Sequence, residues 1–474
     1  MLFNSYSFIF LFAPIVIGGY YWLGKSETRS RFANIWLVLA SLSFYAHWNI
    51  KYLPLLLSSI AVNYFVSGWI IGNRKENPAR ARFVFWSGVF FNVALLGVFK
   101  YTDFFIKNIN LLGGNIPLLH IVLPLGISFF TITQLVYLVD CYEGLVKKRE
   151  LVPYALFVSF FPHLLAGPIL HHKPMMKQFA DERLRRVNWE NMARGLSLFI
   201  IGLAKKVLIA DSFIPYVKAG FDKPESLSMI AAWLTIVAYM MQLYFDFSGY
   251  SDMAVGLARM LNIEIPINFN APYRAYGIID FWQRWHMSLS HVITNYLYTP
   301  MVMGCKNITF TKSMVATFVT MTIVGLWHGA GWTYVVTGMI HGAALVINHV
   351  WKHYHFKMWR PMGYALTLLT IALSFAFFRA EGMAQAGKMF MAMIGGYGIG
   401  MSLPVTKGVQ MLAISGFRIP LMLILAVGLV IYCPTSNELV KREPSYGAMI
   451  VLAAAFSYAV INLSSISEFL YFQF

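Results

Sequence analysis

Two histidines lie inside one of the most apolar stretches of the chain, and imidazole is the side chain best suited to accept a proton near neutral pH. The stretch reads GLWHGAGWTYVVTGMIHG and contains His328 and His341. His328 follows Lys312 by about fifteen residues of apolar sequence. At ~1.5 Å per residue, a helix would place it roughly 20 Å along its axis, inside a hydrocarbon layer. An ionisable group at that depth is either a neutral imidazole bonded within the fold or a functional group.

Small residues around the first histidine favour a functional role for it. Gly325, Gly329 and Gly331 would let backbone or substrate approach His328 closely. His341 lies in a similar apolar context and is expected to be structural. From the residues alone, His328 is either a neutral imidazole that packs between helices or a functional group, and the glycines shift the balance slightly toward function.

A third histidine, His286, stands in the sequence WQRWHMSLS next to Arg284, Trp285 and Ser288. Taken alone, this motif is typical of an amphipathic interfacial helix whose polar side chains face lipid headgroups.

Charged residues interrupt other apolar segments. Lys205 and Lys206 in LFIIGLAKKVLIADSF are expected either to extend to the membrane interface or to bind an anionic ligand. Asp246, Asp252 and Asp280 are candidate helix caps that hold irregular segments in place.

The composition places these residues in a membrane protein. Of 474 residues, 58% are hydrophobic and 12% charged, with a mean hydropathy of +0.61, whereas soluble proteins have roughly a quarter charged residues. The apolar runs have the ~20-residue length of helical spans and lack the alternation of a membrane β-barrel. The formal charge of +17 is concentrated in short loops, so nucleic acid is not needed to explain it. The three cysteines have no metal-binding or disulfide spacing, and we expect no metal.

The pattern predicts an all-α polytopic protein with about 11–13 membrane helices, in a single domain over residues 1–474. The predicted spans are Ser7 to Leu23, Ala33 to Trp48, Tyr52 to Ile71, Phe83 to Phe99, Ile116 to Tyr142, Leu151 to Leu170, Leu196 to Ala210, Met229 to Phe247, Met314 to Trp332, Tyr334 to Trp351, Gly363 to Phe378, Arg418 to Cys433 and Gly447 to Leu463.

Basic loops predict the orientation of these spans. Residues 25–31, 73–82 and 146–150 are basic and separated by pairs of spans, which places them in the cytoplasm and the N-terminus outside. The run from Leu151 to Leu170 has basic flanks on both sides and contains helix-breaking residues, so we expect a re-entrant segment that lines a cavity. Tyr244 to Pro300 mixes charged and aromatic residues and is expected to form short interfacial or re-entrant helices.

Five motifs, in order, carry a resemblance to a known family. They are FFPHLLAGPIL, GLAKKVLIADSF, YFDFSGYSDMAVGLARMLNIEIPINFNAPY, DFWQRWHMSLS and GLWHGAGW. Together they resemble the membrane-bound O-acyltransferase family, in particular its bacterial branch that acts in alginate O-acetylation and in D-alanyl transfer to teichoic acids. The resemblance covers residues 1–350, and residues 351–474 add only generic membrane helices.

The resemblance implies a many-helix fold around a central tunnel and a location in the bacterial inner membrane. It implies that His328 is the catalytic histidine, acting as a general base or, as the alternative, as a transient acyl carrier. It also implies that His286 faces the tunnel, where it would orient the thioester or relay the group. The candidate donor-binding or tunnel residues are Arg284, Trp285, Ser288, Trp327, Lys205, Lys206, Asp246, Asp252 and His341. The donor would be acetyl-CoA, with no bound cofactor, and a periplasmic acetyltransferase would be the partner beside the lipid bilayer itself.

Several functions remain open at this level. The acceptor could be peptidoglycan, alginate or a cellulose-like glycan, because the chain departs from the family pattern after the RWH motif, with HVITNYLYTPMVMGCKN, and after AGPIL, with HHKPMMKQF. Transfer of D-alanine from a carrier protein is the alternative within the family. Secondary transport of an anionic solute is the alternative from another class, although no inverted repeat is visible.

Overall fold

The computed structural model describes residues 1–400, 418–443, 445–464 and 470, and all regular secondary structure in those residues is helical. Six helices there are long and apolar enough to cross a membrane: 50–73, 78–111, 229–260, 310–328, 332–353 and 360–379. The shorter apolar helices are 8–24, 419–432 and 446–461. The all-α, multi-pass class is therefore confirmed. The sequence predicted about 11–13 membrane helices, whereas six helices in the described residues are long and apolar enough to cross a membrane.

The chain forms two compact units, and each contains residues from distant parts of the sequence. Among the described residues, the first comprises 1–202, 250–267, 440–443, 445–464 and 470, and the second comprises 203–249, 268–400 and 418–439. The single-domain assignment stays a prediction. Every candidate site residue except Asp252 belongs to the second unit, so the site can be described within that unit alone.

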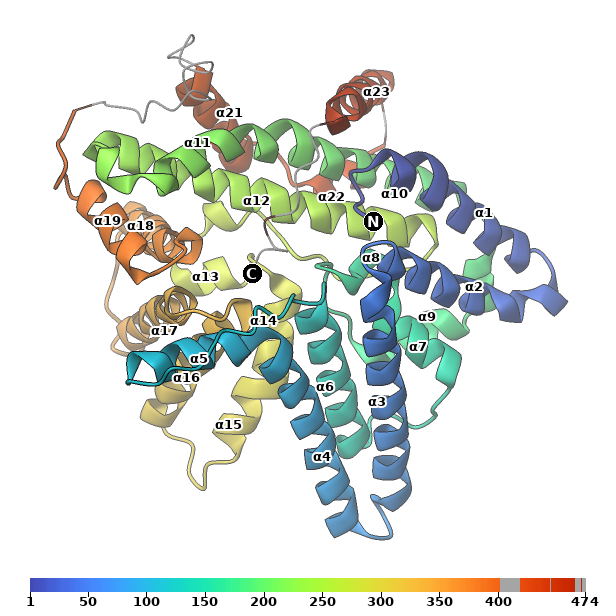
Figure 1. The fold of residues 1–474 in the computed structure, drawn as a ribbon. Coiled ribbons are helices and arrows are strands. Elements are labelled where there is room, and N and C mark those ends of the chain that lie inside the picture. The colour runs from blue at the N-terminus through green and yellow to red at the C-terminus, as the bar shows by residue number, and fades with distance from the viewer. Residues whose placement is uncertain (401–417, 444, 465–469, 471–474) are drawn as a thin grey trace. The chain divides into compact units, whose positions relative to one another are not determined.

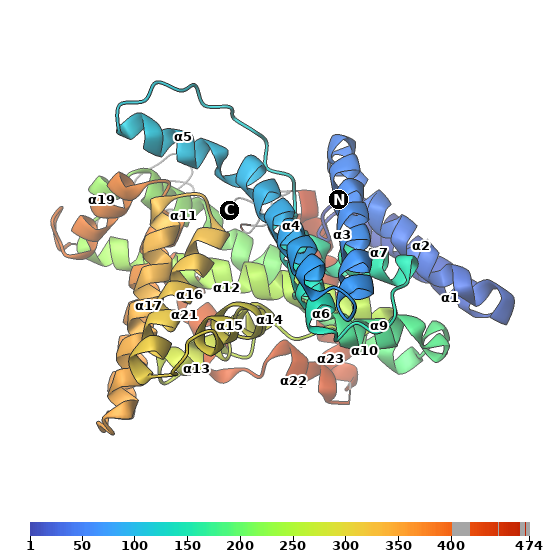
Figure 2. The ribbon, with the colours of Figure 1, turned by 90° about the horizontal axis from the view of Figure 1, so that it is seen from below.

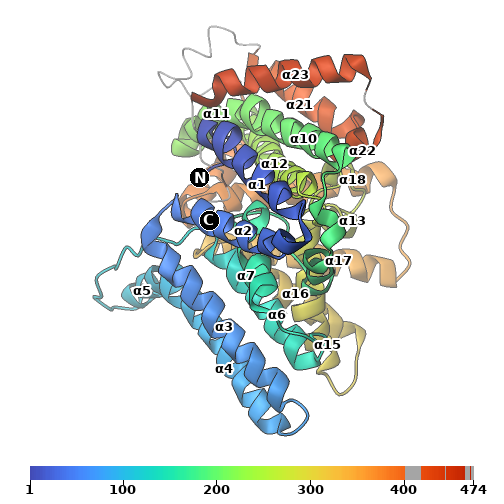
Figure 3. The same ribbon diagram turned by 90° about the vertical axis from the view of Figure 1, so that its right-hand side faces the viewer.

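The first unit is built on α3, α4 and α6, which lie side by side (Figures 1 and 3). Polar side chains join them: Asn63 and Asn92 are buried and exchange amide hydrogen bonds of 2.6 and 3.2 Å. The helices of this part of the chain are α1 (Ala13–Gly24), α2 (Glu27–Ala46), α3 (Leu53–Asn73), α4 (Pro78–Leu96), α5 (Thr102–Leu111), α6 (Ile127–Glu143), α7 (Leu151–Ser159), α8 (Phe161–Leu164), α9 (His172–Ala180), α10 (Trp189–Ala204) and α23 (Tyr446–Ile461). The short helix α22 (Ser436–Lys441) has its first four residues in the second unit and its last two in the first.

Two predicted spans differ from the observed helices in this unit. The span Ile116 to Tyr142 is wrong in its first half, because residues 112–126 are not helical and α6 begins only after Gly126, which adopts a left-handed conformation. The span Leu151 to Leu170 is broken at Phe160, as its helix-breaking residues predicted. Residues 165–170 are buried and non-helical, which places their backbone against protein. Its re-entry into the membrane stays a prediction.

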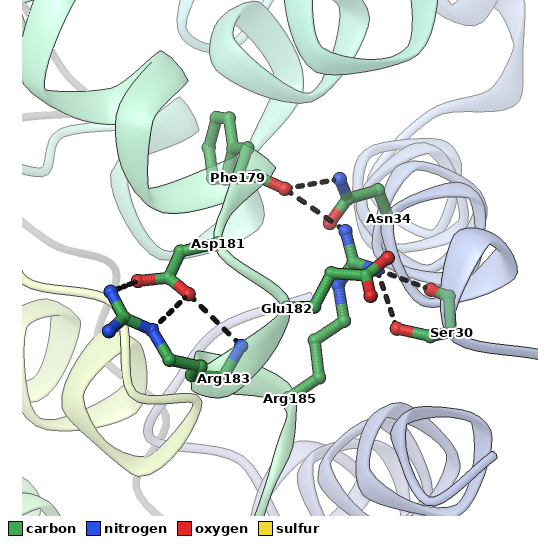
Figure 4. Close-up of polar contacts among 7 residues, drawn as sticks. All are labelled: Ser30, Asn34, Phe179, Asp181, Glu182, Arg183 and Arg185. Atoms are coloured by element: carbon green, nitrogen blue, oxygen red, sulfur yellow. Dashed lines mark hydrogen bonds and ion pairs between the residues drawn. The ribbon is translucent and has the colours of Figure 1, made fainter. Parts of the chain in front are cut away.

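The basic segment between α9 and α10 is anchored by one buried arginine (Figure 4). Arg185 is 6% exposed and donates to the backbone and hydroxyl oxygens of Ser30 on α2, at 2.9 and 2.6 Å. It also donates to the carbonyl of Phe179, which accepts a second bond from Asn34. By contrast, Arg183 is exposed and pairs with Asp181 two residues away. Arg185 therefore fixes this loop to α2, whereas Arg183 remains at the surface.

The second unit contains the α16–α17 hairpin, whose two helices lie side by side (Figure 2). Its helices are α11 (Asp211–Asp222), α12 (Met229–Met260), α13 (Ile278–Trp282), α14 (Met287–Ile293), α15 (Thr299–Met303), α16 (Phe310–His328), α17 (Trp332–His353), α18 (Arg360–Arg379), α19 (Met383–Met393) and α21 (Arg418–Tyr432). A π-helix, η5 (Lys205–Ala210), precedes α11, and another, η8 (Thr294–Tyr298), follows α14.

The prediction of short helices from Tyr244 to Pro300 is half correct. Residues 244–260 continue the single long helix α12, whereas residues 272–303 form the short helices α13, α14 and α15 with their 3₁₀ and π turns. The helix continues past Phe247 because its charged residue Asp246 is buried against a lysine, so the charge does not force the chain out to water.

Candidate active site

His328 is the last residue of α16, at the turn into α17. The two helices approach closely through Gly325 and Gly338, because a Cβ on Gly325 would collide with the carbonyl oxygen of Tyr334 and would lie 2.9 Å from Gly338. Gly325 thus permits backbone contact between the helices. His328 as a residue is partly exposed.

His286 is the N-cap residue just before α14 and is held in an unusual backbone conformation. Its φ of +46° and ψ of +50° are left-handed, a region that a non-glycine residue enters only when its surroundings fix it. The surroundings here are the side chain and backbone of Asn268, whose carbonyl oxygen accepts from the N–H of Met287 at 2.9 Å. The His286 side chain is 1% exposed, and Phe247 packs edge-on against its ring at 4.8 Å.

The amide of Asn268 also determines which ring nitrogen of His286 carries the proton. Its Oδ1 lies 3.2 Å from Nδ1 of His286 and accepts from the N–H and the hydroxyl of Ser288 at 3.2 and 2.6 Å. An atom that accepts from a backbone N–H is the amide oxygen, so Nδ1 of His286 must be the donor. The lone pair is then on Nε2. His286 lies in the segment between the long helices α12 and α16. Burial, together with the nearby His328, lowers the pKa of His286 well below its usual value, so its ring stays neutral.

The two predicted catalytic histidines come together in this unit. The ring centroids of His286 and His328 are 6.5 Å apart, with an angle of 46° between the rings. The ring centroids of Trp327 and Phe378 lie 5.1 and 5.6 Å from that of His328. Two imidazoles at this spacing, in an aromatic enclosure, can act on one reacting group, one as proton acceptor and the other as orienting group.

Lys206 is buried in an ion-pair cluster at η5. Its ammonium lies 2.7 Å from Asp211 and 2.6 Å from Asp246, and Lys206 and Asp246 are 1% and 2% exposed at their side chains. The cluster fixes α12 one residue before Phe247, the residue that packs on His286. Its geometry gives Lys206 and Asp246 a structural role, so contact of Lys206 with an anionic donor stays a prediction. Lys205 lies over the ring of Tyr244 at 5.9 Å.

The remaining candidates surround α13. Arg284 pairs with Asp280 at 2.6 Å, and both are about one-third exposed. Trp285 is buried against Phe281 at a centroid distance of 5.6 Å. His341 is 4% exposed and packs edge-on against Trp282, at 5.2 Å, consistent with the structural role expected of it. Asp252 lies six residues beyond Asp246 on α12 and belongs to the first unit.

A cavity of about 260 Å³ lies between α14, η8, α16 and α17, and neither His286 nor His328 is among the residues that line it. Its walls include Ser290 and Val324, which are one helical turn from His286 and His328 respectively. The lining is largely apolar with a few hydroxyls, the type of surface that accepts a small organic group. The family's central tunnel stays a prediction, and no cluster of three or more potential metal ligands occurs in the described residues.

Sequence reasoning missed the residues that position the histidines. Asn268 lies in the aspartate-rich motif but carries no pattern of its own, and Phe247 and Phe378 resemble any other apolar residues. Asn268 lies 18 residues before His286. Only the succession of the aspartate-rich motif and the RWH motif in the sequence could have linked the two residues.

Comparison with known proteins identifies the family to which this chain belongs. The sequence profile of the membrane-bound O-acyltransferase family matches residues 7–379. The chain belongs to this family. It is 44% identical to the peptidoglycan O-acetyltransferase of Helicobacter pylori, in an alignment covering 84% of this chain and 81% of the relative. It is 38% identical to a probable alginate O-acetylase of Pseudomonas aeruginosa, covering 83% and 75%. It is 26% identical to the teichoic acid D-alanyltransferase of Bacillus subtilis, covering 75% and 90%.

The family membership makes this protein a multi-pass membrane O-acyltransferase. The match includes both histidines, the ion-pair cluster and the α16–α17 hairpin, so the geometry described above lies within the shared part of the fold.

Proposed function

We propose that this protein moves an acetyl group from cytoplasmic acetyl-CoA toward a hydroxyl of a cell-envelope polysaccharide, with peptidoglycan as the first candidate. The observation that carries the proposal is the pair His286 and His328, whose ring centroids are 6.5 Å apart. Asn268 holds the ring of His286. The peptidoglycan O-acetyltransferase among the relatives supports this acceptor, and the alginate O-acetylase supports alginate as the second.

The predicted sidedness fits such a transfer. Five cations, Lys306, Lys312, Lys352, Lys357 and Arg360, lie in or beside the loops at one end of the α16–α17 hairpin, and residues 301–360 contain no acidic residue. The positive-inside rule assigns this end to the cytoplasm and the His328 end toward the opposite face. The N-terminus is assigned to the outside by the same rule.

The chemistry follows from the residues present. The acceptor hydroxyl oxygen attacks the thioester carbonyl carbon, and its proton passes to His328 as general base. The carbon–sulfur bond then breaks, and the leaving thiolate takes up that proton to give free CoA. His286, neutral and oriented by Asn268, accepts a hydrogen bond at Nε2 and aligns the reacting groups. A second, periplasmic acetyltransferase is proposed to complete delivery to the polymer.

The test uses purified protein in proteoliposomes with labelled acetyl-CoA. Wild type should release free CoA when an acceptor is supplied, and His328→Ala should lose this activity while its thermal unfolding stays unchanged. His291→Ala is the control, because His291 is an exposed histidine of the same unit that lies on a different helix, α14. Equal CoA release by wild type and His328→Ala would refute the proposal.

D-Alanyl transfer is the second candidate, because the teichoic acid D-alanyltransferase matches three quarters of the chain. The same assay with a D-alanyl carrier protein would favour it if only that donor is consumed. Movement of an intact anionic solute without consumption of any thioester would instead indicate a transporter.

A further inference from the structure

A cation follows the ring that packs on His328, at the end of α18 that is assigned away from the cytoplasm. Arg379 is the last residue of α18 and comes directly after Phe378, whose ring packs edge-on against that of His328. The helix begins at Arg360, at the end assigned to the cytoplasm, and its 20 residues place Arg379 about 30 Å away. The positive-inside rule explains cations at the cytoplasmic end only, so Arg379 needs another reason.

The charge of Arg379 is not compensated within the described part of the chain. The residue is partly exposed and forms no ion pair there, although Glu381 is only two residues away in the sequence. Its guanidinium lies over the ring of Phe221, 5.4 Å from the ring centroid. A planar cation held against an aromatic face keeps N–H donors at its edge for a further partner, and a carboxylate matches their geometry.

Two tyrosine hydroxyls lie near this guanidinium. Arg379 interacts electrostatically with Tyr334 and Tyr239. Tyr239 is 0% exposed, and its hydroxyl has no hydrogen-bond partner among the described residues. Because buried hydroxyls are normally paired, this one indicates that an acceptor from outside the chain completes the site. An anion beside Arg379 would supply that acceptor.

Tyr334 connects these residues to His328. Its ring packs edge-on against Phe378 with the centroids 5.3 Å apart, and Phe378 packs on His328. The same ring covers Gly329, where an added Cβ would lie 2.3 Å from it. One aromatic layer therefore joins Arg379 to the proposed general base. A molecule that presents a hydroxyl to His328 can present a charged group to Arg379 when both groups belong to one sugar unit.

From these features we propose that Arg379 and Tyr239 bind a carboxylate on the acceptor, so that the acceptor unit is an acidic sugar. The guanidinium and the tyrosine hydroxyl both donate to this carboxylate. The sugar hydroxyl that receives the acetyl group then lies toward His328. This inference rests on the proposed function and narrows its acceptor to sugars with a carboxylate, which are the muramic acids of peptidoglycan and the uronic acids of alginate.

A purely structural role for Arg379 makes a different prediction. A cation at the C-terminus of a helix stabilises that helix, and its loss would then impair the reaction equally for every acceptor. A role in binding the acceptor instead changes the preference between acidic and neutral sugars. The experiment therefore measures a ratio of kcat/KM values, which general damage to the protein leaves unchanged.

The test compares acceptors that differ by one acidic group, in proteoliposomes supplied with acetyl-CoA. N-Acetylmuramic acid and N-acetylglucosamine form one pair, and methyl glucuronide and methyl glucoside form the other. Wild type should prefer the acidic member of at least one pair about tenfold in kcat/KM, as expected for a charge-assisted contact, and the preferred pair identifies the source of the carboxylate. Arg379→Gln should abolish this preference, whereas Arg379→Lys should retain part of it.

Two further variants separate acceptor binding from folding. Tyr239→Phe removes only the hydroxyl without a partner, so it should lower the preference for the acidic sugar without lowering the melting temperature. Arg149→Gln is the matched control and should leave the preference unchanged. Arg149 is also partly exposed, lies over an aromatic ring, that of Tyr64 at 4.2 Å, and has no ion pair in the described residues, but it belongs to the basic loop 146–150.

Two kinetic results would overturn the inference. One is a wild type without preference for either acidic sugar, and the other is an equal preference in Arg379→Gln and wild type. Consumption of acetyl-CoA with a protein acceptor but with none of the four sugars would also overturn it.

A binding measurement distinguishes failure of this inference from failure of the proposed function. Saturation-transfer NMR of the acidic sugars with the purified full-length protein, without acetyl-CoA, should give a signal that Arg379→Gln loses. Such binding in a wild type that consumes no acetyl-CoA would refute the proposed function alone. Equal use of acidic and neutral sugars by a protein that does consume acetyl-CoA would refute the acidic-sugar site alone.

Discussion

Replacement of Asn268 by alanine tests how the site is organised. The side-chain oxygen of Asn268 is the acceptor for Nδ1 of His286 and for both the N–H and the hydroxyl of Ser288. In Asn268→Ala, the buried imidazole loses the bond that fixes its tautomer, and the loop that carries it loses its anchor. The fold itself should survive, because the backbone bond from Met287 to the carbonyl of residue 268 remains.

The magnitude follows from the cost of leaving a buried donor unsatisfied, about 1–3 kcal/mol. If this cost appears in the transition state, kcat falls roughly 5- to 150-fold. KM for the donor should change little, because Asn268 acts through His286. Ser288→Ala removes only one of the three donors and should have a smaller effect.

The assay is steady-state release of CoA from acetyl-CoA in proteoliposomes, with thermal unfolding measured on the same preparations. Asn268→Asp retains an acceptor for Nδ1 and should recover part of the lost rate. A folded Asn268→Ala protein with wild-type kcat would refute the inference that this amide holds His286 in its active tautomer.

Three further predictions concern folding and stability; two are measured by thermal unfolding of the purified protein, and the one for Gly338 by the yield of folded protein. Lys206→Met leaves Asp246 buried without this cation and should lower the free energy of unfolding by about 3–5 kcal/mol. An unchanged melting temperature would show that the Lys206–Asp246 ion pair does not stabilise the fold. Gly338→Leu should prevent closure of the α16–α17 hairpin and lower the yield of folded protein, because its Cβ would lie 3.0 Å from a backbone atom of the opposite helix; a normal yield would show that the helices can separate. Arg185→Gln should lower the free energy of unfolding by about 2 kcal/mol or more, because it removes buried hydrogen bonds. Arg183→Gln, at the surface, should leave the free energy of unfolding unchanged. Equal losses for the two variants would show that Arg185 is not the residue that anchors the loop.

Much of the helical architecture could be predicted from the sequence, because a membrane helix must be a continuous apolar run of sufficient length. The runs at 314–332 and 334–351 correspond closely to α16 and α17. The failures have physical causes. Asp246 seemed to end a span, but its charge is neutralised by Lys206, which is 40 residues away in the sequence. A pairing of this kind leaves no periodic signal.

The candidate site was only partly predictable. Apolar context identified His328 as unusual, but its approach to His286 depends on the turn after α16 and on the left-handed start of α14. The family resemblance implied that both histidines face one tunnel. Asn268, which orients His286, could not be identified because its importance comes from a contact across 18 residues of irregular chain.

The central claim is that His286 and His328 act on the same reacting group. The measurement that tests it most directly is a double-mutant cycle on kcat/KM for acetyl-CoA, using His286→Ala, His328→Ala and the double variant, all confirmed to be folded. Our account predicts that the double variant is about as impaired as the more damaged single variant. Losses that multiply, as for two independent sites, would contradict it.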